Sequence, residues 1–146
     1  MQRGNMRKIL IVEDNEKNRI LIRDILQRFG YETVEAINGR EGIRMTKKHK
    51  PDLILMDMQM PVMDGFKAIE MLRADPGTRN IKIIVVSAFA MKGDRERIIE
   101  VGADDYLSKP LDIRKLMIAI KRILGEEEKG EDGRKGDEGE PADSMC

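Results

Sequence analysis

Five residues capable of metal or phosphate chemistry stand directly after short apolar segments of the chain. Apolar segments of this length, rich in β-branched residues, are typical of strands buried in a parallel sheet. Ligands of an open α/β sheet bind beyond the carboxyl ends of its strands, so a site is expected where these segments end. The set comprises three carboxylates, one hydroxyl and one amine: Glu13, Asp14, Asp57, Ser87 and Lys109.

The three carboxylates predict a site for a hard cation. Carboxylates held close together repel one another and are tolerated where a cation lies among them. Oxygen ligands favour Mg²⁺, completed by water and phosphate oxygens. With this negative charge offset, Asp57 could accept a phosphoryl group as an aspartyl phosphate. Lys109 would add a second positive charge, and Ser87 would donate a hydrogen bond to a phosphoryl oxygen.

Each of these residues also has an ordinary structural interpretation. The run Asp14-Asn15-Glu16 could cap the following helix, Ser87 could belong to a turn or a cap, and Lys109 to a loop. Asp57 has the weakest alternative, because it joins a buried strand to the apolar loop 58–61. The placement of all five at predicted strand ends favours the functional interpretation.

The elements that must position these residues alternate along the chain. The predicted strands span 8–12, 33–36, 53–56, 83–86 and 105–108, and the predicted helices span 16–29, 39–49, 66–74 and 93–101, with a last helix capped by Asp112 and ending near Leu124. Strict alternation with short connections implies right-handed crossovers and a parallel sheet. We therefore predict a five-stranded, doubly wound, flavodoxin-like α/β fold with helices on both faces.

Residues 125–146 differ in composition from the rest of the chain. They carry nine acidic and three basic side chains, so the other residues carry a net charge of +6, because the whole chain is neutral. We interpret 1–124 as one domain and the acidic, Gly-rich segment 125–146 as a disordered tail, with a further helical turn at 126–128 as the alternative. About twenty residues after Leu124 are too few for a DNA-binding output domain.

Composition argues against several other classes of protein. No apolar run approaches the ~20 residues of a membrane span, and no signal peptide pattern is present, so a cytoplasmic location without a membrane partner is expected. Basic residues are scattered and aromatic residues amount to 3%, so direct contact with nucleic acid is not expected. The single cysteine, Cys146, cannot form an internal disulfide or a multi-cysteine zinc site.

Four segments resemble the receiver domain of bacterial response regulators. They are 9–15 (ILIVEDN), 52–65 (DLILMDMQMPVMDG), 85–88 (VVSA) and 102–110 (GADDYLSKP). The resemblance covers roughly residues 7–124, and the combination of motifs is highly specific. The run 88–94 (AFAMKGD) resembles the single-domain receivers of bacterial cell-cycle relays more than transcriptional regulators.

This resemblance implies a role for each of the three carboxylates at the predicted strand ends. Asp57 would be the phosphoacceptor, and Glu13, Asp14 and Asp57 would hold Mg²⁺. The backbone carbonyl of Gln59 would be a further metal ligand. His49, the only histidine, lies at a predicted helix end as a solvated residue, so the phosphodonor is expected to be another protein or a small phosphorylated molecule. The resemblance implies a histidine kinase or a histidine phosphotransfer protein.

The resemblance also implies a phosphorylation switch. Ser87 and Lys109 would bind the phosphoryl group, with the bond from Lys109 to Pro110 in the cis form. Ser87 would then move toward the phosphate and Tyr106 would rotate inward. The surface formed by the helix starting near Lys92, the strand at Tyr106 and the last helix would change for a downstream protein.

The expected activity is limited to self-catalysed phosphotransfer and slow autodephosphorylation, so the chain is not expected to be an enzyme. We expect a monomer or a weak phosphorylation-dependent dimer. Phe89 lies two residues past Ser87, where water would approach the phosphoryl group, and we hypothesise that it slows hydrolysis.

Other functions remain as alternatives. A nucleotide-binding enzyme of this fold would need a Gly-rich first turn, which Glu13-Asp14-Asn15 replaces. A phosphatase with an aspartate nucleophile would generally have a second aspartate where Gln59 stands. A receiver-fold module that binds proteins without phosphorylation, and a receiver fragment of a larger regulator or hybrid kinase, also fit the sequence.

Overall fold

A computed structural model describes residues 6–58, 60, 63–88 and 93–126. Within these ranges, strands and helices alternate along the chain as the sequence predicts. The elements are β1 (Lys8–Val12), α1 (Glu16–Arg28), β2 (Glu32–Ala36), α2 (Gly39–His49), β3 (Leu53–Asp57), α3 (Gly65–Ala74), β4 (Lys82–Ser87), α4 (Asp94–Val101), β5 (Asp105–Ser108) and α5 (Ile113–Leu124).

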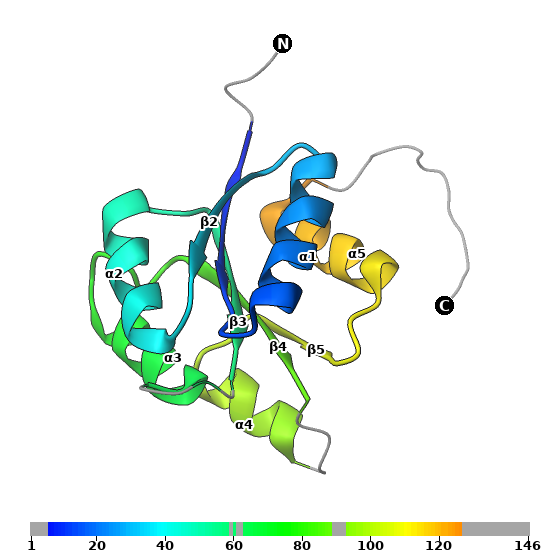
Figure 1. The fold of residues 1–146 in the computed structure, drawn as a ribbon. Helices are drawn as coiled ribbons and strands as arrows, with labels where there is room; N and C mark the ends of the chain where they lie inside the picture. Colours follow the sequence, from blue (N-terminus) through cyan, green and yellow to red (C-terminus); the bar gives the residue numbers. More distant parts are fainter. Residues whose placement is uncertain (1–5, 59, 61–62, 89–92, 127–146) are drawn as a thin grey trace.

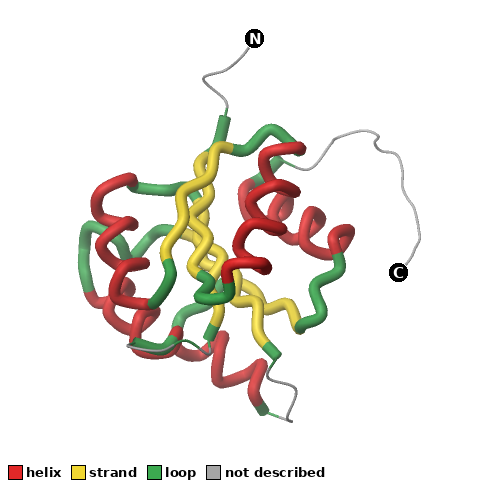
Figure 2. Tube along the Cα trace, in the orientation of Figure 1, coloured by secondary structure: helices red, strands yellow, loops and turns green. Residues whose placement is uncertain are grey.

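The strands form one parallel sheet in the order β2-β1-β3-β4-β5. Figure 1 shows α1 and α5 on one face of this sheet and α2, α3 and α4 on the other. Figure 2 shows the same three layers, with the strands between two groups of helices. The predicted doubly wound fold is therefore confirmed. No helix in the described ranges is both long and apolar enough to cross a membrane.

Each central strand contributes alternate residues to two separate cores. In β1, Leu10 and Val12 join the core under α2, α3 and α4, whereas Ile9 and Ile11 join the core under α1 and α5. Side chains of a strand alternate between faces, so a strand covered by helices on both sides must be apolar at every position. This explains why β1, β3 and β4 read as continuous apolar runs.

Polar side chains fix where the helices begin. Asn15, Asn38, Asp64 and Asp112 each accept a hydrogen bond from a backbone N–H group of the following first turn. These bonds satisfy donors that have no partner within the helix. The predicted cap at Asp112 is confirmed, and within Asp14-Asn15-Glu16 the capping side chain is that of Asn15.

The element limits differ slightly from the predictions. Helix α1 ends at Arg28 rather than Phe29, β2 begins at Glu32, and α3 begins at Gly65. Helix α4 begins at Asp94 because Gly93 has a left-handed φ of 93°, which no residue of a right-handed helix adopts. The predicted tail 125–146 lies outside the described residues except for Gly125 and Glu126, so its predicted disorder stays a prediction.

Candidate functional site

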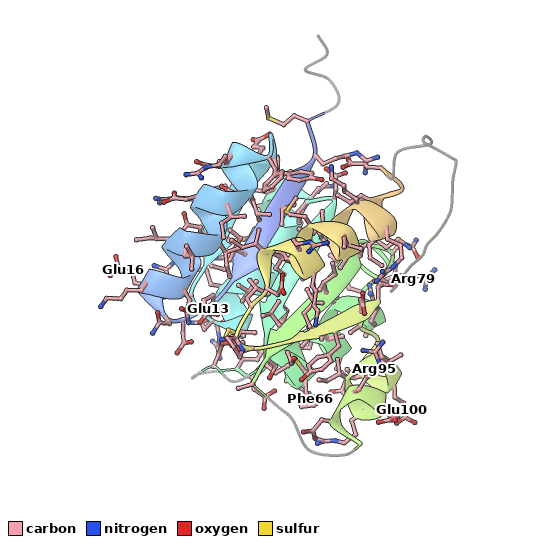
Figure 3. All side chains as sticks on the ribbon, turned by 90° about the vertical axis from the view of Figure 1, so that its right-hand side faces the viewer. Glu13, Glu16, Phe66, Arg79, Arg95 and Glu100 are labelled. Atoms are coloured by element: carbon pink, nitrogen blue, oxygen red, sulfur yellow. The ribbon has the colours of Figure 1, made fainter. Side chains whose placement is uncertain are left out.

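The carboxyl ends of β1 and β3 bring two carboxylates together. Val12 in β1 pairs with Met56 in β3, so Glu13 and Asp57 follow adjacent positions of neighbouring strands. Both side chains are buried, with 3% of Glu13 and 5% of Asp57 exposed. Figure 3 shows Glu13 at this end of the sheet, close to the start of α1. Strand order thus unites residues that are far apart in the chain.

Asp14 completes an acidic cluster with these two residues. One carboxylate oxygen from each of Glu13, Asp14 and Asp57 can be chosen so that all three lie within 4.8 Å of one another. Asp14 is exposed, so the cluster opens to solvent on its side. Three hard oxygen donors with one open side fit a Mg²⁺ ion that retains water ligands. The predicted convergence of the three carboxylates is what the structure shows.

One backbone group and one side chain hold Glu13 in place. The N–H of Asn15 donates to Oε2 of Glu13 at 3.1 Å, and the guanidinium of Arg19 donates to the Glu13 carbonyl oxygen at 3.0 Å. Burial raises the pKa of Glu13 above its usual 4.5, and the charge of Asp57 adds to the increase. The hydrogen bond from Asn15 and the charge of Lys109 lower the pKa and offset part of this increase. A nearby cation would relieve this excess of negative charge.

Lys109, which directly follows β5, reaches the same carboxylates. Its Nζ atom lies 3.3 Å from Oε1 of Glu13 and 3.5 Å from Oδ2 of Asp57. Its backbone N–H donates to the carbonyl oxygen of Ser87 at 2.9 Å, which ties the segment after β5 to the end of β4. The peptide bond between Lys109 and Pro110 is cis, as the resemblance implies.

Ser87 and Tyr106 lie on the adjacent strands β4 and β5. Ser87 is fully buried as the last residue of β4 and pairs with Ser108. Tyr106 is half-buried and packs against the core under α2, α3 and α4. Burial raises the pKa of Tyr106, the charge of Asp94 raises it further, and Arg95 opposes both.

Two residues of the predicted site lie outside the described residues. These are Gln59, whose carbonyl was expected to bind the metal, and Phe89, which was expected to slow hydrolysis. The helix predicted to start near Lys92 begins at Asp94 in the described part of the chain.

A pocket next to the site was not predicted. It has a volume of about 270 Å³ and adjoins the acidic cluster through Glu13 and Lys109. The rest of its lining is mainly apolar: Asn18, Leu21, Ile22, Val86, Pro110 and Leu111. Leu21 of α1 is 58% exposed in this lining.

Comparison with known proteins gives consistent matches. Residues 9–121 match the response regulator receiver domain family. The polar-differentiation response regulator DivK of Brucella anthropi is 44% identical over 120 residues, covering 82% of this chain and 98% of DivK. DivK of Brucella ovis is 43% identical with the same coverage. The predicted resemblance is confirmed, and the coverage indicates that these relatives contain little beyond the matched region.

Solved structures show the same similarity. The receiver domain of a histidine kinase from Syntrophus aciditrophicus has a TM-score of 0.76 and 37% identity, covering 82% of this chain and 90% of that chain. The receiver domain of a sensor histidine kinase from Pseudomonas aeruginosa has a TM-score of 0.76 and 36% identity, covering 82% and 98%. The latter structure has a magnesium ion coordinated in its active-site cleft.

Proposed function

The chain belongs to the response regulator receiver domain family of two-component signalling, and on this basis we propose that Asp57 accepts the phosphoryl group. One observation carries the proposal: two further carboxylates and the Lys109 ammonium converge on Asp57 at the carboxyl end of the sheet. This arrangement supplies an oxygen nucleophile, a place for a metal and a cation for a phosphoryl group.

We assign Glu13, Asp14 and Asp57 as the residues that hold Mg²⁺, with the carbonyl of Gln59 as a further ligand. Their donor atoms are all hard oxygens, which suits this ion. When bound, Mg²⁺ would supply positive charge that offsets the carboxylates and the phosphoryl oxygens. Asp14 would hold the ion from the solvent-exposed side of the cluster, and Glu13 and Asp57 from its buried side.

The transfer step would form one bond and break one. An oxygen of the Asp57 carboxylate attacks phosphorus and forms a P–O bond, while the P–N bond to the donor histidine breaks and its electron pair stays on the histidine nitrogen. Lys109 neutralises charge on the phosphoryl oxygens, and Ser87 donates a hydrogen bond to one of them. Catalysis of this kind depends on positioning and charge rather than on proton transfer.

We propose that the signal passes from Ser87 to Tyr106. Movement of Ser87 toward the phosphoryl group would let Tyr106 rotate inward and alter the face formed by α4, β5 and α5. A downstream protein would read that face, and the donor would be a histidine kinase or a phosphotransfer protein. We propose a cytoplasmic location, no direct nucleic-acid contact, a monomer or weak phosphorylation-dependent dimer, and no enzymatic turnover beyond autodephosphorylation.

The test is incubation with Mg²⁺ and acetyl phosphate, followed by intact mass measurement. The unmodified chain is expected to gain one phosphoryl group, and Asp57→Asn is expected to gain none. Asp24→Asn is the matched control, because Asp24 is an exposed aspartate in the middle of α1. Equal phosphorylation of Asp57→Asn and the unmodified chain would refute the assignment.

A further inference from the structure

An apolar groove lies where the end of α1 meets α5. Its volume is about 280 Å³, and it is lined by Phe29, Ile113, Arg114, Met117, Ile118 and Lys121. Phe29, Ile113 and Ile118 are 50%, 47% and 55% exposed. Figure 3 shows α1 and α5 side by side on the face turned toward the viewer. Large apolar side chains exposed together in this way mark a surface suited to binding.

The groove is also positively charged. Helix α5 carries four basic residues and no acidic residue over Ile113–Leu124. Arg122 forms an ion pair with Asp105 in β5, whereas Arg114 and Lys121 belong to the groove lining. The described lining contains no acidic side chain. An occupant with acidic side chains would therefore complement it.

The chain leaves the described structure beside this groove. Glu126, the last described residue, accepts a hydrogen bond from the Tyr31 hydroxyl at 2.7 Å and lies 3.5 Å from Nε of Arg7. These three residues line a second hollow of about 350 Å³, which shares Phe29 and Lys121 with the apolar groove. The first acidic residue after α5 is thus already bound to the folded body at the end of the groove.

We propose that the groove binds the acidic segment 127–146 of the same chain. This segment carries eight acidic and three basic side chains. Each extended residue spans about 3.3 Å, so the first several residues can reach the groove from Glu126. Covalent attachment gives the segment an effective concentration on the order of millimolar, so weak contacts suffice. Acidic side chains pair with Arg114 and Lys121, while the chain covers the exposed faces of Phe29 and Ile118.

Docking in this position covers the α1–α5 face. Leu21, which lines the pocket next to the phosphorylation site, lies in α1. Phe29 of the groove directly follows the end of that helix. A protein that docks against α1 and α5 would then have to displace the acidic segment. The inference stands on the groove, its charge and the position of Glu126, and it does not depend on phosphorylation of Asp57.

Cys146 provides the probe for a test, because it is the single cysteine of the chain. A nitroxide spin label on Cys146 is expected to weaken the amide NMR signals of Phe29 and α5 more than those of α2 and α3. The effect should be strong at 0.01 M salt and weak at 1 M salt, where the Debye length falls from ~30 Å to ~3 Å. Equal weakening of both faces of the sheet would overturn the proposal.

Charge variants and a mixing experiment complete the test. Arg114→Gln with Lys121→Gln should remove the selective weakening, whereas Arg40→Gln with Lys48→Gln, two exposed cations of α2, should leave it unchanged. Equal effects of the two pairs would contradict the docking site. Spin-labelled chain mixed with isotope-labelled chain lacking the spin label should show no weakening. Weakening in that mixture would make a second copy the occupant and would also overturn the proposal.

Discussion

The Nζ atom of Lys109 lies 3.3 Å from Oε1 of Glu13, although 96 residues separate the two in the chain. The same ammonium lies 3.5 Å from Oδ2 of Asp57, so one cation bridges two buried carboxylates. Lys109 therefore offsets part of the negative charge that would otherwise attract a metal ion. It also stands beside the carboxylate that we assign as the phosphoacceptor.

Lys109→Met should strengthen Mg²⁺ binding and slow phosphorylation. Loss of one positive charge within about 4 Å of the ligands removes repulsion of the metal, and we expect affinity to rise about tenfold. The same loss leaves the phosphoryl oxygens without a neutralising cation. Calorimetric titration with Mg²⁺ and the rate of mass gain with acetyl phosphate measure the two effects. Lys115→Met is the control on α5, and an unchanged Mg²⁺ affinity in Lys109→Met would contradict the bridging role.

Gly65→Ala should destabilise the protein next to the site. A Cβ atom at Gly65 would lie 2.5 Å from Sδ of Met58 and 2.8 Å from the carbonyl oxygen of Asp57. Relief of such contacts requires backbone shifts that cost about 1–3 kcal/mol. Gly77→Ala is the matched control, because its Cβ would meet only Asp75 Oδ1 at 3.4 Å. Urea unfolding measures both, and equal stability of the two variants would argue against a close approach at Gly65.

Arg73→Met should destabilise the end of the sheet away from the site. The Arg73 guanidinium donates to the carbonyl oxygens of Gly102, Arg79 and Ile81 at 2.7–2.9 Å and to Asp104 Oδ2 at 3.0 Å. Removal of these donors leaves acceptors unsatisfied, and we expect a loss of about 3 kcal/mol in the free energy of unfolding.

The exposed Arg79 serves as the control for Arg73. Arg79→Met should change the free energy of unfolding by less than about 0.5 kcal/mol, as is usual for surface substitutions. Hydrogen exchange adds a local reading, because the N–H of Ile83 donates to Asp104 at 2.8 Å and should lose protection in Arg73→Met. Unchanged protection of Ile83 would show that Asp104 keeps its position without Arg73.

Tyr31→Phe should reduce the loss of stability at alkaline pH. Burial raises the pKa of the Tyr31 phenol above its usual 10.0, and the hydrogen bond to Glu126 and its charge raise it further. The neutral phenol is favoured in the folded state, so its contribution is fully present below pH 10 and is lost as the pH rises above that value. Urea unfolding at pH 8 and pH 11 should show a smaller decrease in Tyr31→Phe. An equal decrease would mean that Tyr31 ionises as readily when folded as when unfolded.

The sequence determined the residues of the site and the type of fold. Glu13, Asp57 and Ser87 could be assigned because each follows an apolar run, and side chains at the ends of parallel strands share one edge of the sheet. The runs were readable because strands covered on both faces must be apolar throughout. The start of α4 was harder to predict, since Gly93 precedes the helix with a left-handed backbone and no side-chain cap marks the first turn.

Only the tertiary structure decided how these residues meet. Strand order places β1 beside β3 and so sets Glu13 next to Asp57, and this pairing depends on hydrogen bonds between segments remote in the chain. The position of the Lys109 ammonium follows from the charge of the assembled carboxylates, because a long flexible side chain has no fixed direction in the sequence. The groove beside Phe29 likewise exists only once α1 and α5 cover the same face of the sheet.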